Sequence, residues 1–408
     1  MASLSRHPLV AALLIAIAAQ LLFSWGVTTP STLVFDETHY VPAARTLLAL
    51  ERPANTEHPL LGKTIIAAGI ATFGDNALGW RAFSTIAGTA TVLGVFAILM
   101  LLFGSVRAAA LGALLVAING TLFVQARIAM LDVFMGAFVT LALASLLWAM
   151  RSPSSKVARR WTLGGVLLGL ATATKWTAGP YVALAGLAFL VLKRHDRWAG
   201  LEPVRALVLL GLASVGTYFV TFTPAFFYAE DALTPAGLIP FQWAMFEAQT
   251  QVLSPHPYQS SWWSWPLMLR PIWYLYEPVD GAVRGILLIG NPAVMWGGLA
   301  AVAALGWRWW RERDSADSSV VALWTASLAI WAVIPKSLGF FYYYHLSGVF
   351  CAVALAAAFH RFDAGGRRTA GFVLLALVLF GYFYPILSAA ALENDQAFNR
   401  WMWFASWR

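Results

Sequence analysis

Residues 80–103 read WRAFSTIAGTATVLGVFAILMLLF, and Arg81 is the only charged side chain in this run. About 20 consecutive apolar residues in a helix are enough to cross the hydrocarbon core of a bilayer. Outward from this segment, comparable apolar stretches occupy residues 8–27, 106–123, 129–149, 162–174, 177–192, 203–224, 284–307, 319–335, 339–360 and 368–391. The pattern predicts an all-α polytopic membrane protein with about eleven transmembrane helices, the first of them an uncleaved anchor.

The composition of the 408 residues fits a protein whose main solvent is lipid. Sixty per cent are apolar and 11% are charged, whereas soluble domains carry about 25% charged residues. The net charge of +8 could suggest nucleic acid. We interpret it instead as loop charge that sets orientation in a membrane, so no nucleic-acid partner is expected. The single cysteine, Cys351, excludes an intrachain disulfide.

The basic residues predict how the chain is oriented. With a cytoplasmic N-terminus and eleven crossings, the short and strongly basic loops all lie inside, at residues 151–160, 193–205, 308–313 and 361–368. Cytoplasmic loops are enriched in Lys and Arg. The charge pattern therefore predicts a cytoplasmic N-terminus and a C-terminus outside the cytoplasm.

Residues 161–193 could form one long helix with Lys175 buried in it, or a hairpin of two short helices. One crossing would place a basic cluster on the outer side, because both flanks are basic. A hairpin keeps both flanks inside, and Gly179-Pro180 suits a break. The hairpin is favoured, and it places Lys175 at the outer end.

Two long loops, 28–79 and 225–283, fall on the outer face, and no separate soluble domain is indicated within residues 1–408. The stretch 60–73 is apolar but too short to cross, so it is expected to form an interfacial helix. The whole chain is therefore predicted to be one transmembrane domain, with its active-site face built from these two loops.

The first candidate for chemistry is FDETHY, residues 35–40, just beyond the first apolar segment. Asp36 and Glu37 could simply be solvated loop carboxylates. However, Phe35 and Tyr40 flank the pair at the expected bilayer edge, where desolvation raises the basicity of a carboxylate. A general base needs that property.

A set of charged residues on the outer face would suit an anionic lipid headgroup. Arg81 could contact a phosphate or merely snorkel to the interface, and Asp132 could be functional or could cap a helix. The cations that suit such a headgroup are Lys63, Arg81, Arg127, Lys175 and Lys336, and His58 and Asp132 lie in the same outer segments.

Metal binding is a weaker alternative. The outer histidines His39, His58, His256 and His345 are dispersed, and the chain has no Asp-x-Asp and no pair of cysteines. Asp36 and His39 could hold a metal or only a hydrogen bond. We predict no metal site and no cofactor.

Several motifs together resemble the protein O-mannosyltransferase family, which uses polyprenyl- or dolichyl-phosphate mannose. FDETHY is followed in order by TEHPLLGK (56–63), WRAFSTIAGT (80–89), ARIAMLD (126–132) and ATKWTA (173–178). The later motifs are HPYQSSWWSWPLMLRPIWY (256–274), ILLIGNPAVMWGG (286–298) and PKSLGFFYYYHLSG (335–348). The chain departs from the family at Leu60, and loop 225–283 has no room for the β-trefoil domain of eukaryotic members.

The resemblance implies a GT-C fold with its active site at the outer face of a bacterial plasma (inner) membrane. It implies that Asp36 is the catalytic base, with Glu37 beside it. His58, Lys63, Arg81, Arg127, Asp132 and Lys175 would line the donor site, and His256, Tyr258, Trp263 and His345 the acceptor or long-loop side.

The implied reaction moves mannose from polyprenyl-phosphate mannose to Ser or Thr hydroxyls of exported proteins by a single inverting displacement. The lipid phosphate that leaves needs cations rather than an acid, so one carboxylate base suffices. Expected partners are the polyprenyl-phosphate sugar, membrane lipids and an exported polypeptide at the secretion channel. The runner-up is a lipid-linked sugar transferase that acts on a lipid or glycan, as aminoarabinose transferases do. A transporter or flippase is disfavoured, because ionisable residues gather at the span ends.

Overall fold

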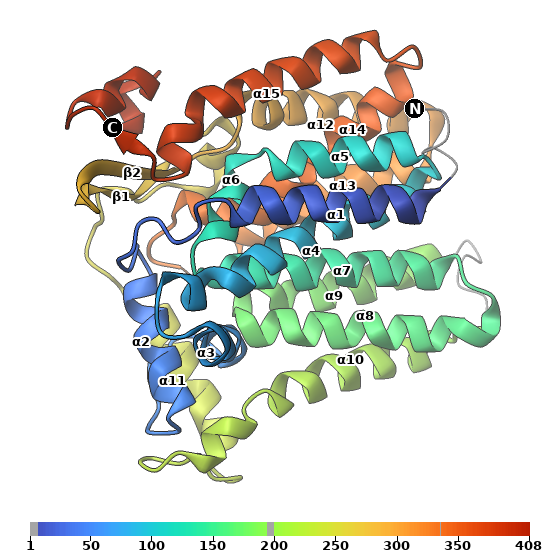
Figure 1. Ribbon diagram of the computed structural model, residues 1–408. Helices are drawn as coiled ribbons and strands as arrows, with labels where there is room; N and C mark the ends of the chain where they lie inside the picture. The colour runs from blue at the N-terminus through green and yellow to red at the C-terminus, as the bar shows by residue number, and fades with distance from the viewer. Residues whose placement is uncertain (1–6, 194–199, 335) are drawn as a thin grey trace.

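The computed structural model describes residues 7–193, 200–334 and 336–408. Its main body is a bundle of helices that run alongside one another (Figure 1). Every predicted apolar segment contains a helix. These helices are α1 (Pro8–Ser24), α4 (Ala77–Phe103), α5 (Val106–Ala117), α7 (Leu131–Met150), α8 (Ser154–Thr174), α9 (Gly179–Lys193), α10 (Pro203–Val220), α12 (Pro292–Glu312), α13 (Ser315–Ala329), α14 (His345–Phe362) and α15 (Arg367–Leu387).

Five helices within the described residues are long and apolar enough to cross a membrane alone, and a sixth span arises if the bent pair Val106–Ala117 and Gly120–Arg127 counts as one. The prediction of a mostly helical, multi-pass protein is confirmed. The count of eleven crossings stays a prediction.

The core of the bundle lies around α14. The apolar stretch of α14 is 83% buried inside the protein, whereas that of α15 is only 22% buried. Small residues allow close helix packing here, as is common in membranes. A Cβ at Gly94 would lie 2.6 Å from Oγ1 of Thr140, and one at Gly298 would lie 2.5 Å from Cβ of Cys351.

The two long loops gather at one end of the bundle, together with the C-terminus, and α1 begins at the opposite end (Figure 1). Loop 28–79 contains α2 (Glu37–Leu48) and α3 (Leu61–Phe73), and loop 225–283 contains α11 (Leu238–Thr250). The helix expected from the apolar stretch 60–73 is confirmed as α3. Its depth in a bilayer stays a prediction.

The prediction of an all-α chain was wrong at one place. Strands β1 (Ile272–Val279), β2 (Ala282–Leu288) and β3 (Ala391–Leu392) form an antiparallel sheet in the order β1-β2-β3. The predicted segment 284–307 therefore begins with a strand, and segment 368–391 ends in one.

The reason is local. Asp280 and Gly281 both have positive φ, +49° and +72°, which suits a tight hairpin between twisted strands. Asn291 then caps α12 by accepting from the backbone N–H of Ala293. The apolar run before it resembles the start of a helix because periodicity alone cannot separate a buried strand from a buried helix.

The break predicted at Lys175 is confirmed. Helix α8 ends at Thr174, a 3₁₀ turn spans Trp176–Ala178, and α9 begins at Gly179 and packs against α8 and α10. Parts of the basic loops used for orientation, residues 1–6 and 194–199, lie outside the described residues.

Candidate active site

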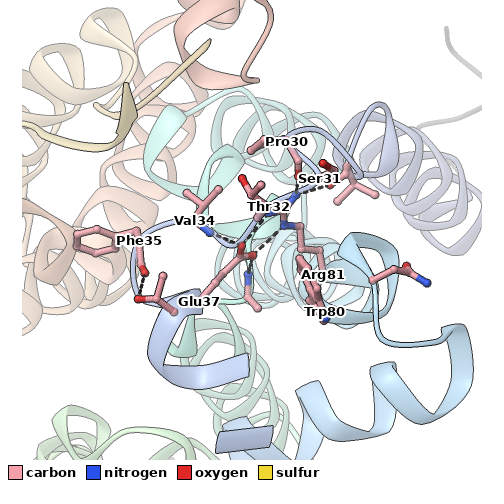
Figure 2. A network of polar contacts seen from close by, with 12 residues as sticks. Pro30, Ser31, Thr32, Val34, Phe35, Glu37, Trp80 and Arg81 are labelled. Carbon is pink, nitrogen blue, oxygen red and sulfur yellow. Dashed lines mark hydrogen bonds and ion pairs between the residues drawn. The ribbon is translucent and has the colours of Figure 1, made fainter. Parts of the chain in front are cut away.

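Glu37 and Arg81 form a buried ion pair directly after Asp36. Nε of Arg81 lies 2.8 Å from Oε1 of Glu37, Nη2 lies 2.8 Å from Oε2, and both side chains are fully buried. Figure 2 shows the two side chains pointing toward each other while Phe35 points away. The pair joins the first residue of α2 to α4 across 44 positions of sequence.

Both side chains form their remaining hydrogen bonds with backbone groups. Arg81 also donates to the carbonyls of Val27, Pro30 and Thr32 at 2.6–3.1 Å. A guanidinium has five N–H donors, so all are used. Glu37 also accepts from the N–H groups of Val34 and Ala129, both at 2.8 Å, which fills the roughly four acceptor positions of a carboxylate. Substrate could reach either side chain only by displacing one of these bonds.

Arg127 is occupied in a similar way. Its guanidinium donates to the carbonyls of Phe23, Trp25 and Gly26, at the C-terminal end of α1. Cations suit the carbonyl end of a helix, where the peptide dipoles leave partial negative charge. Arg127 therefore ties the segment before α7 to the end of α1.

Lys63 closes the loop before α3. Its ammonium donates to the carbonyls of Ala54 at 3.2 Å, Asn55 at 2.6 Å and His58 at 2.8 Å. The ammonium has three N–H donors, and its side chain is almost completely buried. Lys63 thus fixes the backbone that presents the His58 ring.

Unlike the side chains of Glu37, Arg81 and Lys63, the carboxylate of Asp36 keeps free hydrogen-bonding capacity. It stands at the N-cap of α2 but makes no capping bond with its side chain. The carboxylate accepts from the Tyr40 hydroxyl at 3.1 Å. Burial raises the pKa of Asp36, while the nearby charge of Lys175 acts in the opposite direction. The side chain is therefore a carboxylate of increased basicity, with acceptor capacity still available.

Asp132 and Lys175 form a second buried pair beside it. Nζ of Lys175 lies 2.7 Å from Oδ2 of Asp132, with 4% and 2% of the side chains exposed. The break between α8 and α9 carries Lys175, and the first turn of α7 carries Asp132. Lys175 also lies 5.1 and 5.3 Å from the ring centres of Tyr342 and Tyr343. The fold thus brings Asp36, Asp132 and Lys175 together.

His58 is held by a residue that the sequence did not single out. Gln249 of α11 lies 2.9 Å from Nδ1 of His58, and it accepts from the ammonium of Lys336 through its side chain and its backbone carbonyl. Burial, with a smaller contribution from Lys175, lowers the pKa of Lys336 to about 8. Gln249 therefore connects the two long loops with the segment before α14.

The long-loop residues lie further out. The His256 ring centre is 5.2 Å from that of Phe340, which stacks 5.4 Å from Tyr342. Tyr258 lies beneath the guanidinium of Arg270 at 5.0 Å, and Trp263 is 63% exposed. A chain of aromatic rings thus links this loop to the rings beside Lys175.

His345 does not lie with that loop. It begins α14 and is buried in the bundle, with Nδ1 3.3 Å from the carbonyl oxygen of Thr121. A Cβ at Gly136, one turn after Asp132, would lie 2.5 Å from its Nε2. The sequence predicted that His345 lies on the acceptor or long-loop side; the structure places it at the start of α14 inside the bundle, and its role stays a prediction.

Tyr274, Tyr342 and Tyr343 were missed by the sequence reasoning. The aromatic run 341–344 was visible as a motif, but nothing in it marks which ring faces Lys175. Within the part of the chain that the structure describes, no group of three or more His, Cys, Asp or Glu side chains is placed to hold a metal ion.

Two family profiles cover nearly all of the chain. The profile described as dolichyl-phosphate-mannose-protein mannosyltransferase matches residues 13–230, and that of the C-terminal four-span region of protein O-mannosyltransferase matches residues 236–407. The polyprenol-phosphate-mannose–protein mannosyltransferase of Mycobacterium tuberculosis is 29% identical over 97% of this chain and 90% of its own. The Corynebacterium glutamicum protein of the same name is 25% identical over 93% and 89%.

Solved structures share the fold at low identity. A protein O-mannosyltransferase complex of S. cerevisiae bound to the sugar donor has a TM-score of 0.82 at 13% identity, with 98% of this chain and 92% of that one covered. ArnT of Cupriavidus metallidurans bound to undecaprenyl phosphate has a TM-score of 0.62 at 17% identity, with 90% and 62% covered. The expected GT-C fold is confirmed.

Proposed function

The chain belongs to the dolichyl-phosphate-mannose–protein mannosyltransferase family and is a membrane glycosyltransferase; from this premise we propose its donor, acceptor and mechanism. The donor is polyprenyl-phosphate mannose, and the acceptor is a Ser or Thr hydroxyl of an exported protein. The names of the mycobacterial and corynebacterial relatives support both assignments.

Asp36 acts as the general base. Its carboxylate takes the proton of the acceptor hydroxyl while that oxygen attacks the anomeric carbon of mannose. The new glycosidic bond forms on the side opposite the breaking bond to phosphate, so the configuration inverts and polyprenyl phosphate leaves. The raised pKa of Asp36 and its free acceptor capacity support this role.

Lys175 and Lys336 stabilise the negative charge on the leaving phosphate. Lys175 stands beside Asp36, and Asp132 orients its ammonium. Within the described residues no carboxylate pairs with Lys336, whose contacts are to Gln249. Preorganised cations in a site of low dielectric are effective at such developing charge.

Arg81, Arg127 and Lys63 act mainly by positioning backbone. Arg81 and Glu37 fix the segment on both sides of Asp36, and Lys63 fixes the loop that carries His58. The resemblance implied that these cations line the donor site, and they remain neighbours of it. Their hydrogen bonds to backbone carbonyls favour a structural role for these three side chains over direct binding of the phosphate.

We place the active end outside the cytoplasm of a bacterial plasma membrane. Eleven crossings would carry the chain from a cytoplasmic N-terminus to an outer C-terminus. Helix α1 begins at one end of the bundle and the chain finishes at the other, which supports an odd number of membrane crossings (Figure 1). The enzyme would then meet its acceptors at the secretion channel, as exported polypeptides.

The observation that carries the proposal is the base at Asp36 beside a buried lysine–aspartate pair. The test uses purified protein, polyprenyl-phosphate mannose and a Ser/Thr-rich peptide, followed by mass spectrometry. We expect hexose on the peptide with the wild-type protein and at least about 100-fold less in the same time with Asp36→Asn. Transfer to a lipid or glycan but not to the peptide would favour the runner-up acceptor class and contradict the proposal.

A further inference from the structure

Tyr274 of β1 has a buried hydroxyl with no hydrogen-bond partner among the described residues. The residue is 5% exposed. Its ring stacks on Phe35, with ring centres 4.1 Å apart and planes 17° from parallel. Buried polar atoms almost always have a partner in folded proteins. An unpaired hydroxyl beside a catalytic loop therefore indicates a partner that arrives with the substrate.

The hydroxyl lies in the field of two carboxylates. Burial, then the charges of Asp132 and Asp36, raise the pKa of Tyr274 well above its ordinary value. The group therefore stays protonated at physiological pH and acts as a hydrogen-bond donor.

The surroundings have the character of a sugar site. Phe35 lies between Tyr274 and Tyr342, whose ring centre is 6.0 Å away edge-on, and Tyr342 contacts Tyr343 at 4.5 Å. Aromatic faces offer apolar surface for the C–H groups of a hexose. Carboxylates accept from its hydroxyls, and a protonated phenol donates to one of its oxygens.

We propose that the Tyr274 hydroxyl donates a hydrogen bond to an oxygen of the transferred hexose and thereby helps the enzyme to select its sugar. This inference rests on the proposed function, since it assumes a hexose on the lipid phosphate. It assigns to the hairpin of loop 225–283 a direct role in binding the donor sugar.

The test compares two ligands, polyprenyl-phosphate mannose and polyprenyl phosphate, on Tyr274→Phe. This variant keeps the ring and its stacking on Phe35. We expect the Kd for the mannose-bearing lipid to rise about 5- to 30-fold, the effect of one buried hydrogen bond. The Kd for polyprenyl phosphate should stay within about twofold of wild type.

Tyr276→Phe is the matched control, because Tyr276 lies on the same strand and its hydroxyl donates instead to the carbonyl of Asp395 at 2.8 Å. Its affinity for both ligands should be unchanged. The thermal midpoint of ligand-free Tyr274→Phe should equal or exceed that of wild type, because an unpaired buried hydroxyl is lost. A clear fall would reveal a structural partner and overturn the inference.

The other outcomes are equally decisive. Equal weakening for both lipids would make Tyr274 a phosphate contact, and an effect on the peptide KM alone would make it an acceptor contact. Unchanged binding and turnover would show that it contacts no substrate. Each of these overturns the inference, whereas absence of any transfer by the wild-type protein would overturn the proposed function itself.

Discussion

The carboxylate of Glu37 and the guanidinium of Arg81 meet through two 2.8 Å contacts from which solvent is excluded. This pair anchors the residue next to Asp36 to the long helix α4. The segment that carries Asp36 is thus held by this ion pair to the bundle as well as by its own short turns. We therefore expect the placement of the Asp36 carboxylate to depend on Arg81, whose N–H donors are all used within the protein.

Arg81→Ala should therefore destabilise the protein. Loss of one partner leaves a buried charge uncompensated, which costs about 3–5 kcal/mol. The measurement is thermal unfolding in detergent. The matched control is Arg45→Ala, because Arg45 and Asp75 make the same two-point contact with 40% and 46% of their side chains exposed. That change should cost at most about 1 kcal/mol.

A different result would indicate that Arg81 binds the donor phosphate directly. If Arg81→Ala kept the wild-type unfolding midpoint and lost only donor affinity, its guanidinium would be a ligand contact, as the motif resemblance implied. The positioning role would then be wrong.

Lys175→Gln should weaken binding of polyprenyl phosphate about 10- to 100-fold, because a charge-assisted hydrogen bond to the phosphate is lost. Asp132→Asn should weaken it less, since Asp132 orients the ammonium without contacting the anion. Lys156→Gln, at an exposed site on α8, should leave the Kd unchanged. Unaltered affinity in Lys175→Gln would remove Lys175 from the donor site.

The rate should fall in acid at a higher pH than for an ordinary aspartate. Only the ionised Asp36 accepts a proton, and burial raises its pKa above the ordinary value, so activity is lost as the pH drops through that raised value. Tyr40 stabilises the ionised form by donating to it. Tyr40→Phe should therefore move the acid limb of kcat/KM to higher pH. An unmoved limb, or one moved to lower pH, would argue against Asp36 as the titrating base.

The C-terminus should lie outside the cytoplasm. A reporter enzyme that works only in an oxidising exterior, fused after Arg408, should be active, and the same reporter fused after Arg313, between α12 and α13, should be silent. Activity of the second fusion in place of the first would invert the topology and place the active end in the cytoplasm.

Much of the fold could be predicted because lipid imposes simple rules on sequence. The apolar runs located every helix of the bundle, and the basic flanks of residues 161–193 correctly indicated the break at Lys175. The strand at Ala282–Leu288 was missed because its apolar end was assigned to the start of α12, although Gly290-Asn291-Pro292 separates the two. Such a short apolar stretch carries no period that separates strand from helix.

The sequence could predict which residues belong to the candidate site, but not which of their side chains contact one another. Asp36, Asp132 and Lys175 were each visible as charged residues at span ends, yet only the fold shows which of them touch. Arg81 also looked like a free cation, because Glu37 lies far from it in sequence. Tyr274 carried no signal at all, since an aromatic residue in a strand is ordinary until its hydroxyl is found without a partner.

The central claim is that Asp36 is the base of the transfer, and Asp36→Asn tests it most directly. Turnover and donor Kd are measured on the same purified variant. Turnover should fall about 10²- to 10⁴-fold, the usual contribution of a general base. The donor Kd should hold or improve, because the base acts on the acceptor hydroxyl and its charge repels phosphate. Turnover within about threefold of wild type, worth only ~0.7 kcal/mol of activation free energy, or a collapse of donor binding along with turnover, would contradict the account.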